Sequence, residues 1–351
     1  MITINTHIST SLGGIETLIR ELQIQYLGSE RKIKELFKYD GADEVYQKST
    51  SVDYIEYGFY KGNSVFKVVS ALNLKNALRK QKPVGEDVFL FHPTDLLYIP
   101  VSVLDNNNVI MVQTNRFDII FTKFGKLAMS LRGKYIKHFT VYTAYDREHL
   151  AQLYPELSNK ISIIPRGCKI EKAHNIPPIS KKILMVCRIE EKQKNFKAAV
   201  EVFKHLPDDY RLDIYGTGDA VEIAELTKLI SSDSRISYKG ATDKVEEVYR
   251  QYSLFLMTSK YEGFGQTLIE ARSQGLPIVL FDTFPAAKWI VRNSENGYLI
   301  SPYNTQDMAL KIRTILESPE IYHAFCHGAL LLADETTKHT VNERWKELRV
   351  E

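Results

Sequence analysis

The chain has 351 residues, of which 44% are hydrophobic and 25% are charged, a composition typical of an ordinary globular protein. This length favours two domains over one. The formal net charge of +3 is too small to indicate a nucleic-acid-binding protein, so we expect no nucleic-acid partner.

The first half of the sequence alternates short apolar runs with longer helical patterns. Helical periodicity is clear over 15–26 and 64–80. The apolar runs predict strands at 1–6, 36–37, 52–57, 87–91, 109–112, 139–143 and 161–165. Alternating strands and helices are typical of a parallel sheet with helices on both faces.

The proline-bearing, irregular residues 173–180 predict an interdomain linker, which places a first domain at 1–172. A second strand–helix series follows at 181–337, with strands predicted at 182–188, 212–216, 236–240, 254–257 and 278–281. The fold class is therefore α/β, with two Rossmann-like, doubly wound domains.

The clearest chemical pattern lies between the strands at 254–257 and 278–281. A Glu262-Gly263-Phe264-Gly265 turn joins the first strand to a helix that ends before Gly275-Leu-Pro277. Free N–H groups and the helix dipole favour a phosphate at such a turn. Glu262 and Glu270 flank it, eight positions apart. Phosphate-binding groups beside carboxylates indicate a sugar nucleotide as the ligand.

This pattern resembles the E-x7-E motif of the family 4 retaining glycosyltransferases, which have the two-domain GT-B fold with a cleft between the domains. The resemblance implies that Glu262 meets the hydroxyls of the transferred sugar and that Glu270 accepts hydrogen bonds from the ribose. The residues implied to line the donor are Gly14, Gly263, Phe264, Gly265, Gln266, Thr267 and Glu270. Glutamates on a solvated helix face are the alternative for the spacing alone, and core packing is the alternative for Phe264.

Two further segments resemble the same family. Arg188 and Lys194 match its Gly-Arg-Leu-x(3–4)-Lys segment, with Cys187 in place of the glycine, and the resemblance implies that both cations grip the nucleotide diphosphate. Two fixed cations stabilise a leaving diphosphate without a metal ion, so we expect neither a metal nor a cofactor. Plain surface cations are the alternative, and Lys192 is a possible substitute for Lys194.

The loop Ser11-Leu-Gly13-Gly14-Ile-Glu16 resembles the family's Gly-Gly-x-Glu loop, which places Gly14 at the donor diphosphate. An ordinary strand–helix turn is the alternative reading of these glycines.

The acceptor side is predicted from residues that follow strands of the first domain. His92 follows the strand at 87–91, and Gln113 follows the strand at 109–112. Many relatives have a histidine at the second position, and Gln113 can orient a hydroxyl there but cannot take its proton. Asn115 and Arg116 are further candidate contacts. A structural role is the alternative for His92.

Residues 119–138 combine basic and apolar side chains and contain no acidic residue. This pattern indicates peripheral contact with an anionic membrane surface, and a solvated helix face is the alternative. Three scattered cysteines, no signal-peptide pattern and no apolar run of membrane-spanning length predict a cytoplasmic protein, or one at the inner face of the cell membrane.

Together these features predict a metal-independent retaining hexosyltransferase. It would move a hexose or N-acetylhexosamine from a nucleotide-diphosphate sugar, with UDP as the first choice, to a glycan, glycolipid or cell-surface polysaccharide. A sugar-nucleotide epimerase on the same fold and an inactive glycosyltransferase-like binding subunit are the alternatives. The family resemblance also implies that a C-terminal helix, about 338–351, packs on the first domain.

Overall fold

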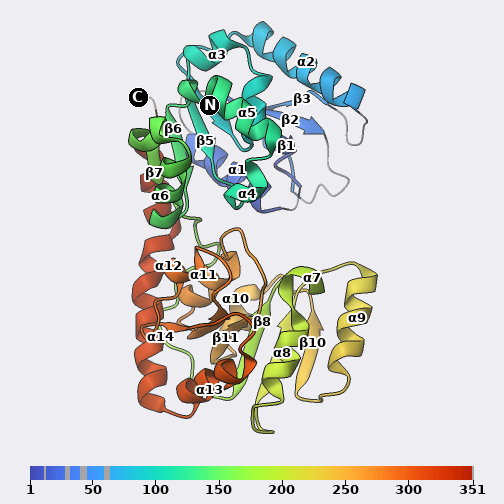
Figure 1. Cartoon of the computed structure of the whole chain (residues 1–351), viewed down its shortest axis with the longest axis vertical. Helices are drawn as coiled ribbons and strands as arrows, with labels where there is room; N and C mark the ends of the chain where they lie inside the picture. Colours follow the sequence, from blue (N-terminus) through green and yellow to red (C-terminus); the bar gives the residue numbers. More distant parts are fainter. Residues whose placement is uncertain (12, 28–31, 40–45, 59–63, 350–351) are drawn as a thin grey trace. The chain divides into compact units, whose positions relative to one another are not determined.

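The computed structural model describes residues 1–11, 13–27, 32–39, 46–58 and 64–349, so Leu12 of the predicted Gly-Gly loop and the last two residues lie outside it. The chain forms two compact units (Figure 1). Unit 1 comprises residues 1–165 and 342–351, and unit 2 comprises residues 166–341.

The described part of unit 1 contains a seven-stranded, all-parallel sheet in the order β3-β2-β1-β4-β5-β6-β7. Its strands are β1 (Ile2–His7), β2 (Ile33–Tyr39), β3 (Val52–Glu56), β4 (Asp87–Leu90), β5 (Asn108–Val112), β6 (His138–Val141) and β7 (Ile161–Ile163). Its helices are α1 (Gly14–Tyr26), α2 (Ser64–Gln81), α3 (Val101–Asp105), α4 (Phe117–Ile120), α5 (Lys123–Arg132) and α6 (Ala144–Leu153), with short 3-10 turns η1 (Pro93–Leu97), η2 (Gly133–Tyr135) and η3 (Pro155–Lys160).

Unit 2 repeats this plan with a six-stranded parallel sheet in the order β10-β9-β8-β11-β12-β13 among its described residues. The strands are β8 (Lys182–Val186), β9 (Arg211–Tyr215), β10 (Ile236–Gly240), β11 (Leu254–Met257), β12 (Ile278–Phe281) and β13 (Gly297–Ile300). The helices are α7 (Glu191–Lys194), α8 (Phe196–Phe203), α9 (Ala220–Ile230), α10 (Val245–Tyr249), α11 (Gln266–Ser273), α12 (Ala287–Ile290), α13 (Thr305–Leu316) and α14 (Pro319–Ala333), followed by η4 (Asp334–Thr336).

The predicted α/β class and the two Rossmann-like domains are confirmed. Strands covered by helices on both faces read as continuous apolar runs, and all four residues of β11 and of β12 are buried. The prediction missed β13, because its apolar run is only three residues long. Gly297 opens that strand, and a Cβ placed there would lie 2.0 Å from the carbonyl oxygen of Ile278 on β12. Only glycine allows the two strands to pair so closely.

Each sheet changes its direction of winding once. In unit 1 the chain moves outward from β1 on one side and from β4 on the other, and in unit 2 it does so from β8 and β11. Ligands of doubly wound sheets bind beyond the carboxyl ends of the two strands at this switch point. The topology therefore selects the loops after β1 and β4, and those after β8 and β11.

The boundary between the units falls before the predicted linker. Cys168 N donates a hydrogen bond to Thr336 O at 2.7 Å, which holds the segment after residue 165 to unit 2. The predicted linker, 173–180, also belongs to unit 2, where Tyr322 Oη donates to Pro177 O at 2.9 Å. Irregular, proline-bearing sequence here lacks regular secondary structure but does not lack contacts.

The last described residues belong to unit 1. Helix α15 (Lys338–Lys346) starts among the residues of unit 2, and residues 342–349 belong to unit 1. Trp345 is 4% exposed, with its ring 6.0 Å from that of Phe89 on β4. Asn108 Nδ2 donates to Leu348 O at 2.8 Å. The C-terminal segment therefore completes the core of unit 1.

We expect Trp345→Ala to lower the free energy of unfolding of unit 1 by about 3–5 kcal/mol, because it removes a buried aromatic side chain and leaves a cavity. Lys346→Ala is the matched control, since Lys346 is exposed and pairs with exposed Glu343. Guanidinium unfolding of both variants measures the difference. Equal stability of the two would show that the segment does not contribute to the core.

Candidate functional site

The loops after β8 and β11 lie at the switch point of unit 2. The two strands pair in parallel, with Leu254 opposite Ile183 and Phe255 opposite Leu184, so their carboxyl ends reach the same edge of the sheet. The loop after β8 carries Arg188 and leads into α7, whereas the loop after β11 carries Glu262. The pairing thereby brings together residues that are far apart in the sequence.

An ion pair joins these two loops. Lys194 Nζ lies 2.6 Å from Glu262 Oε1, and each side chain is 11% exposed. Asn195, in a left-handed conformation with φ of 59°, ends α7 and begins the turn into α8. Thr258 Oγ1 donates to Lys194 O at 2.9 Å, which ties the end of α7 to the other loop. Low exposure strengthens the pair relative to one in water.

Gln193 connects the pair to Arg188. Its Nε2 donates to Glu262 Oε2 at 3.2 Å and to Tyr261 O at 3.1 Å, while its Oε1 accepts from Arg188 Nη2 at 3.1 Å. Arg188 also lies 2.7 Å from Glu190, and its side chain is 65% exposed. The network therefore contains one buried cation and one solvent-facing cation on the same edge of the sheet.

Lys192 lies on the same short helix as Lys194 but is exposed. Side chains two residues apart on a helix point in different directions, so Lys194 reaches Glu262 and Lys192 does not. Of the two lysines considered from the sequence, Lys194 is the one in the network.

The glycine turn has a direct conformational cause. Gly265 adopts φ of +100° immediately before α11, and a Cβ there would lie 2.9 Å from Leu268 Cδ1. Both the dihedral angle and the lack of space favour glycine. Phe264 is 5% exposed, with its ring 6.0 Å from that of Trp289, so the ring packs inside unit 2. Gly263 and Thr267 flank this packed turn and helix start.

Glu270 lies in α11 and is buried, at 7% exposure. Tyr249 Oη donates to Glu270 Oε2 at 3.1 Å. Burial raises the pKa of Glu270, while Lys169 and the hydrogen bonds from Tyr249 and Gln266 partly oppose that shift. Gln266 Nε2 also donates to Gly167 O at 2.9 Å. A buried carboxylate held by a tyrosine retains lone pairs that can accept from a hydroxyl-bearing ligand.

The sequence reasoning missed three contributors to this site: Gln193, Tyr249 and the Gly216-Thr-Gly218 segment. A Cβ at Gly218 would lie 2.6 Å from Ile189 O, and Ile189 N donates to Thr217 O at 2.7 Å. This close approach supports the loop that carries Arg188. The Gly-x-Gly directly after a predicted strand was an available signal, whereas nothing local marks Gln193 or Tyr249.

Unit 1 has a pocket of about 580 Å³ at its own switch point. We call it the strand-end pocket. Its lining includes Thr6 on β1, Lys38 on β2, Ala71 on α2, and Tyr57, His92, Asp95 and Tyr98. His92 lies just beyond β4, where its Nδ1 accepts from Thr94 N at 3.2 Å and caps η1. The histidine therefore both shapes the turn and faces the pocket.

Asp95 is a further titratable residue of the strand-end pocket that the sequence did not single out. Burial raises the pKa of this carboxyl from 3.8 to about 7, and Lys38 partly opposes the shift. Burial also lowers the pKa of His92. The pocket therefore carries two groups whose charged forms are disfavoured by desolvation.

The other acceptor-side candidates do not line the strand-end pocket. Gln113 is 1% exposed; its Oε1 accepts from Tyr142 N at 3.1 Å, and its Nε2 donates to Asp146 Oδ1 at 3.3 Å. Arg116 forms a two-bond ion pair with Asp118, at 3.0 and 2.6 Å, and Asn115 Oδ1 accepts from Arg116 N at 2.8 Å. Gln113 thus connects the end of β5 to the residues that follow β6.

Gly14 opens α1, as expected of a strand–helix turn. The carboxylate of Glu16 folds over Gly13, because a Cβ placed on Gly13 would lie 1.9 Å from Glu16 Oε2. Thr17 Oγ1 donates to Gly13 O at 2.8 Å. A carboxylate of the chain itself therefore lies close to this helix start.

The basic stretch 119–138 forms α4, α5 and η2. One side of it is buried, including Ile120, Ala128 and Met129. Apolar side chains also face solvent, with Phe124 67%, Leu127 48% and Leu131 58% exposed.

In the part of the chain that the structure describes, no helix is long and apolar enough to cross a bilayer. The described residues also contain no group of three or more His, Cys, Asp or Glu placed to hold a metal ion.

The chain is similar to known glycosyltransferases. Residues 169–329 match the family model described as Glycosyl transferases group 1. The chain is 30% identical over 179 residues to poly(glycerol-phosphate) alpha-glucosyltransferase of Bacillus subtilis, covering 49% of this chain and 26% of that protein. It is 27% identical over 289 residues to the GtfA subunit of UDP-N-acetylglucosamine–peptide N-acetylglucosaminyltransferase of Streptococcus pneumoniae, covering 76% of this chain and 54% of that one.

The fold itself is that of known glycosyltransferases. The lipopolysaccharide outer core galactosyltransferase WaaB aligns with a TM-score of 0.77 at 16% identity, covering 99% of this chain and 98% of that one. The architecture is therefore the GT-B type. The chain spans about half or less of the length of the two curated relatives, 26% and 54%.

We expect Asp95→Asn to raise the free energy of unfolding at pH 8 by about 1–3 kcal/mol and to have little effect at pH 4.5. An acid whose pKa is raised in the folded state binds its proton more tightly there, so wild-type stability falls as pH rises from 3.8 to about 7. Asparagine cannot ionise and avoids that loss. Guanidinium unfolding at both pH values measures the gap, with exposed Asp105→Asn as control. A gap independent of pH would contradict the raised pKa.

Proposed function

We propose that this protein is a retaining glycosyltransferase of family 4 that transfers a hexose or N-acetylhexosamine from a UDP-sugar. The observation that carries the proposal is the buried Lys194–Glu262 pair at the switch point of unit 2, with Arg188 connected to it through Gln193. A nucleotide sugar needs cations for its diphosphate and carboxylates for its hydroxyls. The match to Glycosyl transferases group 1 covers this whole set of residues.

In the proposed donor complex, Arg188 and Lys194 bind the diphosphate, and Glu262 binds hydroxyls of the transferred sugar. Lys194 already contacts Glu262, so one ammonium group can bridge the sugar end and the phosphate end of the donor. Glu270 accepts hydrogen bonds from the ribose hydroxyls, with Tyr249 holding the carboxylate in place. The two glutamates thus read different parts of one ligand.

The proposed reaction needs no metal ion. The bond between the anomeric carbon and the phosphate oxygen breaks, and its electron pair stays on the departing diphosphate. Arg188 and Lys194 stabilise that growing charge. The oxygen of the acceptor hydroxyl forms the new bond on the same face of the sugar, and its proton passes to the leaving phosphate. The anomeric configuration is thereby retained.

The acceptor is proposed to bind in the strand-end pocket of unit 1, beside His92 and Asp95. A volume of about 580 Å³ is within the usual range for small-molecule sites and accommodates a sugar unit. The names of the relatives include both a polymer and a peptide as acceptors. We propose a glycan, glycolipid or cell-surface polysaccharide as the acceptor class.

We expect Lys194→Met and Glu262→Gln each to lower kcat for sugar transfer by about 100-fold or more, because both groups act on the charged donor in the transition state. Lys192→Ala, on the same helix but exposed, is the matched control and should retain wild-type kcat. Transfer is measured by mass spectrometry of products from UDP-hexose and UDP-N-acetylhexosamine. Wild-type turnover in Lys194→Met would refute the proposed site.

Further measurements complete this experiment. Removing one member of a buried ion pair costs about 3–5 kcal/mol, so thermal unfolding must show that each variant is folded, and the double variant removes both charges together. Incubation with donor alone tests the alternatives: conversion of the donor without an acceptor indicates an epimerase, and failure to bind any nucleotide sugar indicates a binding subunit. NMR of the product reports the anomeric configuration.

We also propose that unit 1 contacts an anionic membrane surface through residues 119–138. Phe124 and Leu131 expose apolar side chains on α5, and Lys123 and Lys126 lie on the same helix. Apolar side chains enter the membrane interface, and neighbouring cations attract anionic lipid headgroups. Both contributions add to the affinity for the membrane. This placement suits a lipid-linked acceptor.

We expect Phe124→Ser with Leu131→Ser to weaken binding to phosphatidylglycerol vesicles by about tenfold or more, since each side chain loses the gain from leaving water. Val221→Ser with Leu310→Ser is the matched control, because these residues of unit 2 are 67% and 57% exposed, close to the 67% and 58% of the α5 pair. Vesicle co-sedimentation measures binding. Equal losses in both double variants would refute a membrane role for α5.

A further inference from the structure

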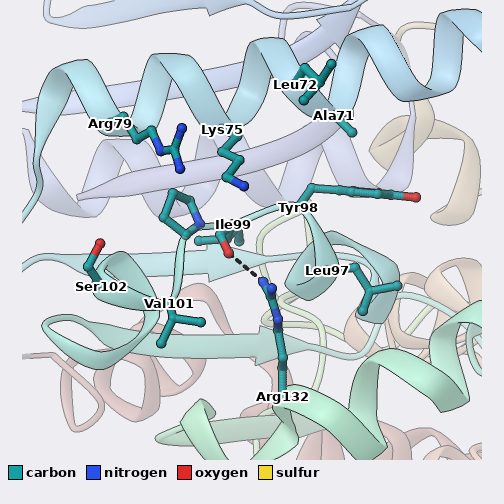
Figure 2. A pocket seen from close by; sticks show the side chains of 11 residues that line it. Ala71, Leu72, Lys75, Arg79, Leu97, Tyr98, Ile99, Val101, Ser102 and Arg132 are labelled. Carbon is teal, nitrogen blue, oxygen red and sulfur yellow. Dashed lines mark hydrogen bonds between the residues drawn. The ribbon is translucent and has the colours of Figure 1, made fainter.

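A second pocket in unit 1 is lined by cations from two helices. It has a volume of about 420 Å³, and we call it the basic pocket. Lys75 and Arg79 reach it from α2, Arg132 reaches it from the end of α5, and Tyr98, Val101 and Ser102 form part of its wall. Figure 2 shows Lys75 and Arg79 extending from α2 towards the pocket, with Arg132 rising from the opposite side.

The guanidinium of Arg132 is held in place by the chain. Its Nη1 donates to Leu96 O at 2.7 Å and to Ile99 O at 2.6 Å, the second of which is drawn in Figure 2. Among the residues that the structure describes, its Nε and Nη2 have no protein acceptor. The group is therefore oriented by two carbonyls and keeps donors for a ligand.

The side chains of Lys75 and Arg79 have no hydrogen bond or ion pair within the described residues. They lie four residues apart on α2, so they share one face of the helix and repel each other. The described residues that line the pocket include no carboxylate to balance these charges. Three cations that converge on a concave site without a counter-charge raise the local concentration of anions.

The basic pocket adjoins the strand-end pocket, because Ala71 and Tyr98 line both. A ligand that places a hydroxyl-bearing group beside His92 can extend past Tyr98 towards Arg132. We infer that the basic pocket binds a phosphate group of the acceptor, a phosphate monoester or diester next to the sugar or polyol unit that is glycosylated. This inference rests on the proposed function.

A phosphate suits the pocket better than a carboxylate does. A phosphate offers tetrahedral oxygens to donors that arrive from different directions, and here the donors come from α2 above and α5 below (Figure 2). A carboxylate presents its two oxygens in one plane and is satisfied by a single guanidinium. The volume of about 420 Å³ also leaves room for the groups on either side of a diester.

The test is a calorimetric titration of the full chain with sn-glycerol 3-phosphate. Saturating UDP is present throughout, so that any diphosphate site in unit 2 is already filled. We expect wild type to bind the probe, Lys75→Ala with Arg79→Ala to bind it about tenfold or more weakly, and glycerate, the carboxylate analogue, to bind more weakly than the phosphate. Lys80→Ala removes a charge from the same helix outside the pocket and is the matched control. Thermal unfolding verifies that the variants fold.

The outcomes separate the two proposals. Loss of probe affinity in the double variant but not in Lys80→Ala supports the basic pocket as a phosphate site. If the soluble probe does not bind, but phosphatidylglycerol vesicles bind with the same dependence on Lys75 and Arg79, the phosphate is that of a lipid. The inference is overturned if all variants bind sn-glycerol 3-phosphate and the vesicles as wild type does. It is also overturned if wild type binds glycerate as tightly as sn-glycerol 3-phosphate. UDP binding by wild type is measured separately, and its absence would refute the proposed function instead.

Discussion

The parallel pairing of β8 with β11 is the constraint on which the site of unit 2 depends. The chain winds in opposite directions from these neighbouring strands, so the two loops beyond their carboxyl ends lie beside each other at one edge of the sheet. Lys194 and Glu262 meet there at 2.6 Å. Burial of an ion pair is costly unless further hydrogen bonds accompany it, and Gln193 supplies one to the carboxylate.

The environments of the two glutamates differ in a way that favours separate roles. Glu262 forms an ion pair with a lysine, whereas Glu270 lies inside α11 with Tyr249, and burial raises the pKa of Glu270. A carboxylate in the second environment costs stability when it is ionised. Carboxylates with raised pKa values are common at ligand sites, which agrees with the proposed contact of Glu270 with a ribose.

Unit 1 uses the same topology for a different surface. Its switch point carries a pocket with Asp95 and His92 rather than a buried ion pair. Three cations line a second pocket beside it, and the described residues of that lining include no carboxylate. Apolar side chains on α5 remain exposed next to lysines. These cations and apolar side chains lie where the proposed phosphate-bearing or lipid-linked acceptor would bind.

The order and class of the elements could be predicted from the sequence because they depend on local periodicity. The strand at 254–257 and the glycine turn after it lie where the pattern placed them. Gly265 is favoured there because its φ is positive.

The contacts between residues distant in the sequence could not be predicted in this way. The sequence marked Lys194 and Glu262 separately, but only the pairing of strands brings them into contact, 68 residues apart. Gln113 lies in the interior and Phe264 packs on Trp289 for the same reason: which atoms surround a side chain depends on elements distant in the chain. The convergence of α2 and α5 on the basic pocket is likewise a property of tertiary structure alone.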